Sequence, residues 1–169
     1  YFNENTDLAL FIFFAIIIVA VFLKYNFPRA KIFLGDSGSY FLGAFIAISV
    51  IKTSIANPLI SPFYFCILLF YLFFEVFFSF IRKIVNEKKS PLFPDRKHLH
   101  MLIYKILFKK NNDKLKSNYY VSIILNLAYL ILILPAIFMM GDGTFCKYYS
   151  IVLFTAYLFA YKKIHEKIK

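Results

Sequence analysis

A single carboxylate lies between glycines and serines in the segment K-I-F-L-G-D-S-G-S, residues 31–39, where a long apolar run begins. Glycines beside Asp36 let the backbone approach a ligand and adopt a positive φ. The N–H groups of a helix that starts here would suit a phosphate, and Lys31 adds positive charge. Asp36 repels a phosphate, but a divalent cation between the two would remove this conflict, and Mg²⁺ commonly binds in this way through one or two carboxylates and substrate phosphates. A simpler interpretation is that Asp36 and Ser37 only cap the helix.

A second polar cluster, P-D-R-K-H-L-H at residues 94–100, joins an arginine to two histidines, and two prolines predict extended backbone at its start. On a helix, His98 and His100 would lie about 200° apart, so as metal ligands they are a weak signal. As hydrogen-bond donors to a phosphate beside Arg96 they are a better match, since protonated histidine and arginine both bond anions. A solvated charged loop is the alternative.

The composition places these clusters in a membrane protein. Hydrophobic residues make up 61% of the 169-residue chain and the mean hydropathy is +0.69, which is typical of chains that span a bilayer. The net charge of +11 is concentrated between the apolar blocks, which favours loops facing anionic lipid over nucleic-acid binding. Cys66 and Cys146 have no metal or redox spacing, so we interpret both as packing residues.

The chain contains five long apolar segments. In lipid every backbone polar group must be bonded internally, and segments without strict alternation predict helices rather than barrel strands. We therefore expect an all-α integral membrane fold, a single membrane domain with about five transmembrane helices and two large cytoplasmic loops. The predicted spans lie near residues 8–23, 40–56, 63–81, 119–140 and 148–161.

The connections between these segments alternate between basic and neutral. Lysine and arginine gather in residues 24–39, in residues 82–118 and in the tail, residues 162–169, whereas the other two connections carry only Lys147. By the positive-inside rule the three basic segments face the cytoplasm. Asp36 and the histidine cluster then share one side of the membrane, which favours Mg²⁺-assisted phosphoryl transfer at the cytoplasmic surface.

One part of the second basic loop has the pattern of an amphipathic helix. Residues 98–110, H-L-H-M-L-I-Y-K-I-L-F-K-K, carry apolar side chains at helical spacing with a basic opposite face. The pattern predicts a helix that lies on the membrane surface or caps the space between two spans.

The motif N-x-x-x-A-K-I-F-L-G-D-S-G-S, residues 26–39, and the motif P-D-R-K-H-L-H, two spans later, resemble polyprenyl-phosphate sugar-1-phosphate transferases of glycosyltransferase family 4. The resemblance covers nearly the whole chain, as the C-terminal half of an enzyme of the undecaprenyl-phosphate N-acetylglucosaminyl-1-phosphate transferase type. It implies transfer of a sugar 1-phosphate from a UDP-sugar to undecaprenyl phosphate, with release of UMP. This is the first membrane step in the synthesis of envelope polymers such as lipopolysaccharide or teichoic acid.

The same resemblance implies a setting and a set of functional residues. The cofactor would be Mg²⁺, or Mn²⁺ in its place, in a multi-pass protein of the bacterial inner membrane, and a homodimer is compatible with it. Asp36 matches the acid that binds the metal and acts in catalysis, and His98 and His100 match the catalytic histidine motif. The implied substrate-binding residues are Asn26, Lys31, Phe33, Gly35 and Arg96.

Three features depart from the family pattern. Met101 stands where the branch has a further histidine, and Glu75 stands where the third span usually has aspartate. No paired-aspartate motif precedes Asp36, and the first residue is Tyr1 rather than methionine. We therefore expect a fragment of a larger helical bundle that is inactive by itself.

Alternative functions stay open at this point. One is a phospho-N-acetylmuramoyl-pentapeptide transferase-like enzyme, and another is a truncated, non-catalytic membrane protein that binds lipid or a partner. A third is a piece of a transporter or channel, for which Glu75 inside an apolar span is the main support, because intramembrane acids often mark ion pathways.

Overall fold

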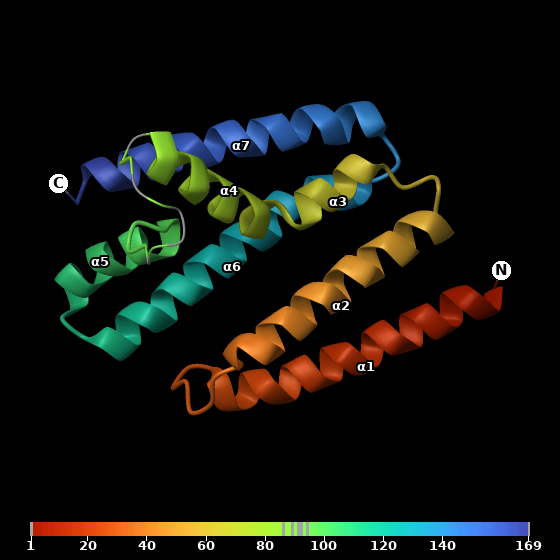
Figure 1. The fold of residues 1–169 in the computed structure, drawn as a ribbon, viewed down its shortest axis with the longest axis horizontal. Helices are drawn as coiled ribbons and strands as arrows, with labels where there is room; N and C mark the ends of the chain where they lie inside the picture. The colour runs from red at the N-terminus through yellow and green to blue at the C-terminus, as the bar shows by residue number, and fades with distance from the viewer. Residues whose placement is uncertain (1, 86, 89, 91–92, 94, 169) are drawn as a thin grey trace. The chain divides into compact units, whose positions relative to one another are not determined.

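The computed structural model of the protein describes residues 2–85, 87–88, 90, 93 and 95–168, with side chains from residue 6 onward. Every regular element in these ranges is a helix, so the all-α prediction is confirmed (Figure 1). The helices form two compact units, Tyr1–Ile60 and Ser61–Lys169, and each is described by itself. The seven helices of the described residues are α1 Phe2–Asn26, α2 Gly35–Ala56, α3 Pro62–Leu68, α4 Phe70–Val85, α5 Leu99–Asn111, α6 Lys114–Phe138 and α7 Gly143–Glu166.

The first unit is an antiparallel pair of helices, α1 and α2, which lie side by side and are joined by the loop 27–34 (Figure 1). Phe11 of α1 and Phe45 of α2 contact each other across the pair, with ring centroids 5.2 Å apart. Helix α2 has no buried residue. Most apolar side chains of α1 are exposed, while Leu8, Ile12, Val19 and Phe22 form a half-buried stripe along that helix. Such surfaces suit lipid or further protein rather than water.

In the second unit, α3 and α4 are two halves of one apolar stretch, bent by 76° at Leu69. Ser61 caps α3 by accepting a hydrogen bond from the Phe63 N–H at 3.2 Å, and Pro62 occupies the first helical position. At the bend, the hydroxyl of Tyr129 on α6 donates to the carbonyl of Leu68. A side chain thus satisfies a carbonyl at the break, as a membrane environment requires.

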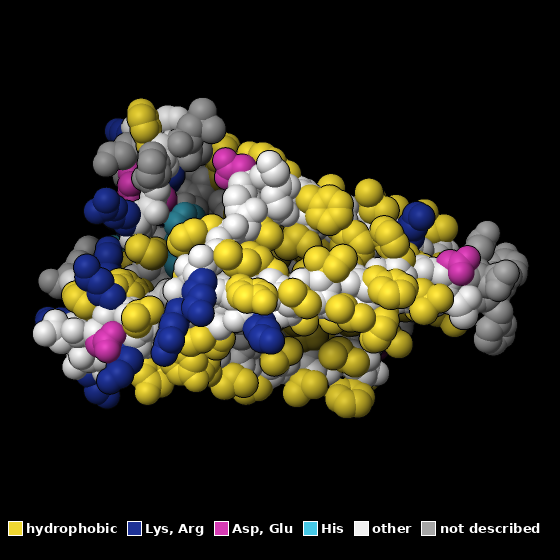
Figure 2. Space-filling view, turned by 90° about the horizontal axis from the view of Figure 1, so that it is seen from below, with side chains coloured by type: hydrophobic (Ala, Val, Ile, Leu, Met, Phe, Trp, Pro, Cys, Tyr) yellow, Lys and Arg dark blue, Asp and Glu magenta, His cyan; other side chains and the backbone are white. Residues whose placement is uncertain are grey.

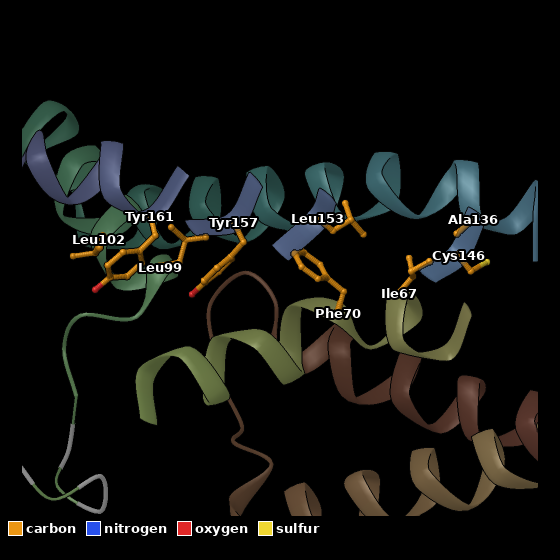
Figure 3. Close-up of a cluster of buried hydrophobic side chains, with 9 residues drawn as sticks. All are labelled: Ile67, Phe70, Leu99, Leu102, Ala136, Cys146, Leu153, Tyr157 and Tyr161. Carbon is orange, nitrogen blue, oxygen red and sulfur yellow. The ribbon is translucent and has the colours of Figure 1, made fainter. Parts of the chain in front are cut away.

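The core of the second unit follows one side of α7. Leu153, Tyr157 and Tyr161 lie in a row along that helix and meet residues of α3, α4 and α5 (Figure 3). The buried cluster consists of Ile67, Phe70, Leu99, Leu102, Ala136, Cys146, Leu153, Tyr157 and Tyr161. The packing role predicted for Cys146 is confirmed, because its side chain is fully buried, whereas Cys66 is exposed and that prediction is wrong for it.

Three helical stretches are long and apolar enough to cross a membrane: Thr6–Asn26, Gly35–Ala56 and Lys114–Phe138. They contain the first two predicted spans and most of the fourth, and the third becomes a further span if the bent pair α3 and α4 counts as one. The fifth predicted segment, 148–161, lies within α7, which is not among these stretches in the described chain. Hydrophobic side chains cover much of the surface visible in Figure 2, as a helical membrane protein requires.

Candidate active site

Asp36 lies in the first turn of α2, directly after Gly35, whose φ of +69° is a backbone conformation that favours glycine. The residue at the N-cap position is Leu34, and it makes no side-chain capping bond. Asp36 is exposed, and its carboxylate has no hydrogen-bond partner among the described residues. The capping interpretation is therefore not supported, and the carboxylate stands at the positive end of the helix dipole, where it is open to a cation.

The loop before Asp36 is held by its own polar groups. The side-chain amide of Asn26 donates to the carbonyl of Ile32 at 2.8 Å, and the N–H of Lys31 donates to the carbonyl of Tyr25 at 3.1 Å. Phe33 projects from this loop and is 83% exposed. In this structure Asn26 shapes the loop, while Lys31 and Phe33 are exposed side chains that a ligand can reach.

In the second unit, a buried carboxylate anchors the histidine motif. Glu75 of α4 is 7% exposed, and its Oε1 accepts hydrogen bonds from Nδ1 of His98 at 3.0 Å and from the N–H of Leu99 at 2.8 Å. Its Oε2 accepts a bond from the hydroxyl of Tyr157 at 2.8 Å. One side chain therefore joins α4 to the start of α5 and to α7.

Asp95 forms the second anchor of the motif. Its carboxylate accepts hydrogen bonds from the Ser79 hydroxyl at 2.7 Å and from the Lys97 N–H at 2.9 Å, and it pairs with the guanidinium of Arg82. Burial raises the pKa of Asp95, but these hydrogen bonds and the charge of Arg82 outweigh that effect and set the pKa at about 2. Asp95 is thus a stable anion at neutral pH.

Further contacts hold the same loop against its neighbours. Glu87 pairs with Arg82 and, at 2.7 Å, with the ammonium of Lys97, whose hydrogen bond lowers the pKa of Glu87. The hydroxyl of Tyr161 on α7 donates to the carbonyl of Lys97 at 2.9 Å, and Lys83 donates to the carbonyl of Phe93. The described part of the loop, residues 87–88, 90, 93 and 95–100, is therefore ordered, and we call it the platform. It is not the solvated loop of the alternative interpretation.

The two histidines lie against each other at the start of α5. Their rings are nearly parallel, at 10°, with centroids 5.6 Å apart. His98 has extended backbone just before the helix and His100 lies inside it, so the separation expected within one helix does not apply. The extended entry predicted from the two prolines falls on positions 91 and 94, which lie outside the described residues.

His100 and Arg96 are both exposed residues. Partial burial of the His100 ring lowers its pKa against the raising effect of Glu75, and the nearby His98 lowers it further. His100 also lines a hollow of about 340 Å³ with Met101, Tyr104 and Lys114. Arg96 is exposed, and in the described part of the chain only its backbone carbonyl is engaged, by Lys105 at 3.3 Å. The guanidinium is therefore open to an anion.

The predicted site residues thus fall into two groups. Those of the first unit lie in the loop 27–34 or at the helix ends beside it: Asn26, Lys31, Phe33, Gly35 and Asp36. Those of the second unit share one platform: Arg96, His98 and His100. Sequence reasoning did not predict the contacts of Glu75, Asp95 and Tyr157 with this platform. Glu75 was visible as an acid inside an apolar run, but nothing marked Tyr157 among the many aromatic residues.

The donor set for a metal is small. No group of three or more histidine, cysteine, aspartate or glutamate side chains in the described ranges is placed to hold a metal ion. An exposed, unpaired Asp36 fits the mode in which Mg²⁺ takes one carboxylate and completes its shell with water and substrate phosphates. The site therefore fits a metal that arrives with its substrate.

Comparison with known proteins gives partial matches. The model of the family described as "Glycosyl transferase family 4" matches residues 1–54. The undecaprenyl-phosphate alpha-N-acetylglucosaminyl 1-phosphate transferase of Thermotoga maritima is 42% identical over 79 residues, covering 47% of this chain and 25% of that protein. The "Probable undecaprenyl-phosphate N-acetylglucosaminyl 1-phosphate transferase" of Bacillus subtilis is 40% identical over 87 residues, covering 47% and 22%. The decaprenyl-phosphate N-acetylglucosaminephosphotransferase of Mycobacterium leprae is 33% identical over 99 residues, covering 50% and 24%.

No solved structure matches the chain. The matched part of the chain spans about a quarter of the length of these curated relatives. The resemblance predicted from the motifs is confirmed over that part: the chain is similar to polyprenyl-phosphate N-acetylglucosaminyl 1-phosphate transferases, and its residues 1–54 match glycosyl transferase family 4.

Proposed function

We propose that the protein transfers a sugar 1-phosphate, N-acetylglucosamine 1-phosphate or that of a related N-acetylhexosamine, from a UDP-sugar to undecaprenyl phosphate. The observation that carries the proposal is the exposed Asp36 at the start of α2, inside the segment that matches the family model. The similarity to N-acetylglucosaminyl 1-phosphate transferases supports N-acetylglucosamine over a muramoyl-pentapeptide substrate.

The reaction is a displacement at phosphorus. An oxygen of the lipid phosphate attacks the phosphorus that carries the sugar, a new P–O–P bond forms, and the bond to the bridging oxygen of UDP breaks. UMP leaves with that oxygen, so no electrons are gained or lost. Such transfers depend mainly on positioning and on neutralising charge, which carboxylate, arginine and histidine groups can provide together with a metal.

Each group of residues has a role in this proposal. Asp36 would hold the metal ion, and Mg²⁺ or Mn²⁺ supplies neutralisation and polarisation of the diphosphate when bound. Lys31 and Arg96 would attract the phosphates, His100 would donate a hydrogen bond to them, and His98 would accept one from a hydroxyl of the lipid phosphate. Phe33, exposed beside Asp36, is available to pack against the uracil ring.

The proposed location follows from charge. The basic loops 24–39 and 82–118 would face the cytoplasm of a bacterium, where UDP-sugars are available, and the isoprenoid acceptor would lie in the bilayer. In this setting the acceptor phosphate lies at the level of the head groups, beside the start of α2.

The direct test is a transfer assay with the full-length protein in phospholipid nanodiscs. Undecaprenyl phosphate is supplied with radiolabelled UDP-N-acetylglucosamine, UDP-N-acetylgalactosamine or UDP-N-acetylmuramoyl-pentapeptide. We expect label in the lipid phase, with equimolar UMP, from an N-acetylhexosamine donor. Transfer only from the pentapeptide donor, or release of free sugar phosphate without a lipid product, would refute the proposal.

A further inference from the structure

Glu75 is a buried acid whose two oxygens have separate tasks. Oε1 accepts both bonds from the histidine motif, at 3.0 Å from His98 Nδ1 and 2.8 Å from the Leu99 N–H, whereas Oε2 accepts from the hydroxyl of Tyr157. Burying a carboxylate costs free energy unless hydrogen bonds replace its water. The structure therefore fixes this carboxylate, and with it everything that donates to Oε1.

The bond to Glu75 decides which nitrogen of His98 carries a proton. An ionised carboxylate only accepts hydrogen bonds, so Nδ1 must be the protonated nitrogen. The nearest acid to Nε2 is Asp95, whose Oδ2 lies 4.0 Å away, beyond hydrogen-bond distance. Among the described residues Nε2 has no hydrogen-bond partner, so it is the nitrogen that remains for a ligand.

Oε1 of Glu75 also fixes the backbone directly after His98. By accepting the Leu99 N–H, Oε1 satisfies one of the free donors at the first turn of α5 and places a negative charge at the helix N-terminus. Ring and backbone of His98 are thus oriented by one atom. A side chain that only filled space in α4 would do neither.

We propose that Glu75 is the positioning residue of His98: it sets the tautomer and the orientation of the imidazole so that Nε2 faces the substrate. In this tautomer Nε2 carries a lone pair, so the inference rests on the proposed function for the group on which Nε2 acts, a hydroxyl of the lipid phosphate that donates to it. It assigns to Glu75 a role through His98 rather than a contact with substrate or metal.

Tyr157 provides a matched control. Tyr157→Phe removes a hydrogen bond from the same buried carboxylate but leaves the bonds to His98 and Leu99 in place. Glu75→Met removes the acceptor at similar size. Glu75→Gln keeps a carbonyl oxygen that can accept both bonds but loses the negative charge, so it is the conservative variant that should restore part of the function.

The experiment combines nitrogen NMR with kinetics on the full-length protein in nanodiscs. In protein carrying ¹⁵N-labelled histidine, with the His98 signals assigned from a His98→Gln sample, we expect a protonated Nδ1 in wild type and in Tyr157→Phe. Glu75→Met should lose this tautomer, and its kcat should fall about tenfold to hundredfold, as is usual when a partner that orients a histidine is removed. KM for the UDP-sugar should change little. The kcat of Glu75→Gln should lie between those of wild type and Glu75→Met.

Two results would overturn the inference: a protonated Nδ1 retained in Glu75→Met, or an equal loss of kcat in Tyr157→Phe and Glu75→Met. If Glu75→Met does not fold, the kcat of Glu75→Gln is compared with that of Tyr157→Phe. A larger loss in Glu75→Gln supports the inference, because only this variant alters the group that faces His98, and an equal loss overturns it. The NMR measurement needs no turnover. If the tautomer depends on Glu75 in a protein that transfers no sugar phosphate, the proposed function fails and the positioning role stands.

Discussion

Nδ1 of His98 lies 3.0 Å from Oε1 of Glu75, and this contact joins the loop before α5 to the buried face of α4. The histidine motif is therefore built on the helices of the second unit rather than suspended in solvent. A site held on packed elements keeps its geometry better than one on a free loop. The following predictions concern the groups that form this platform and the acid of the first unit.

Replacing His98 tests the histidine motif itself. We expect His98→Ala to lower the rate of sugar-phosphate transfer by at least about a hundredfold, the usual contribution of a positioned acid–base or donor group. The measurement is initial velocity in nanodiscs at saturating UDP-sugar. His165→Ala, which alters a histidine of α7 outside the motif, should stay near the wild-type rate. An equal loss in both variants would show that the effect is not specific to the motif.

The Arg82–Asp95 pair should be the main attachment of the loop. Their side chains are 7% and 6% exposed, so Arg82→Met leaves the buried carboxylate of Asp95 without this cationic partner. We expect a loss of about 3–5 kcal/mol in the stability of the platform. Hydrogen exchange in residues 95–102, followed by mass spectrometry, reports this loss.

Lys116→Met serves as the control for that experiment. It removes the cation of the Lys116–Asp113 pair, which is 72% and 40% exposed. Since exposed pairs contribute little, its exchange should match wild type. Unchanged protection of residues 95–102 in Arg82→Met would contradict the anchoring role.

The low pKa of Asp95 predicts an acid limit for the platform. The folded value of about 2 lies below the ordinary 3.8, so the ionised form is stabilised by folding. This contribution is fully present above the ordinary value and is lost as the pH falls from there towards 2. Exchange in residues 95–102, corrected for the intrinsic rate, should rise over this range in wild type.

Asp95→Asn checks the assignment of that transition. The variant lacks the titrating group, so its exchange should be faster than wild type at neutral pH and should not show the same acid step. A wild-type platform that opens only near pH 6 would instead assign the transition to a histidine.

The helical fold and the position of Asp36 could be predicted because both depend on local pattern. Long apolar runs without alternation must be helices in lipid, and the helical spacing over residues 98–110 agrees with α5, Leu99–Asn111. The glycines around Asp36 likewise marked the turn, where Gly35 has positive φ.

The contacts across the second unit could not be predicted, because they join residues far apart in the sequence. Glu75 contacts His98, which is 23 residues away in the sequence, and Tyr157, which is 82 residues away. No local sequence pattern predicts either contact. The 76° bend at Leu69 has neither proline nor glycine at the break. The hydrogen bond from the Tyr129 hydroxyl to the Leu68 carbonyl accompanies this bend, and it depends on the packing of α6.

The measurement that most directly tests the central claim is sugar-phosphate transfer against Mg²⁺ concentration for wild type, Asp36→Asn and Asp7→Asn. Asp7, another exposed acid of the first unit, is the matched control. The account predicts Mg²⁺-dependent transfer in wild type and Asp7→Asn, and none in Asp36→Asn present at the same level in the membrane. Near-normal, Mg²⁺-dependent transfer by Asp36→Asn would contradict it.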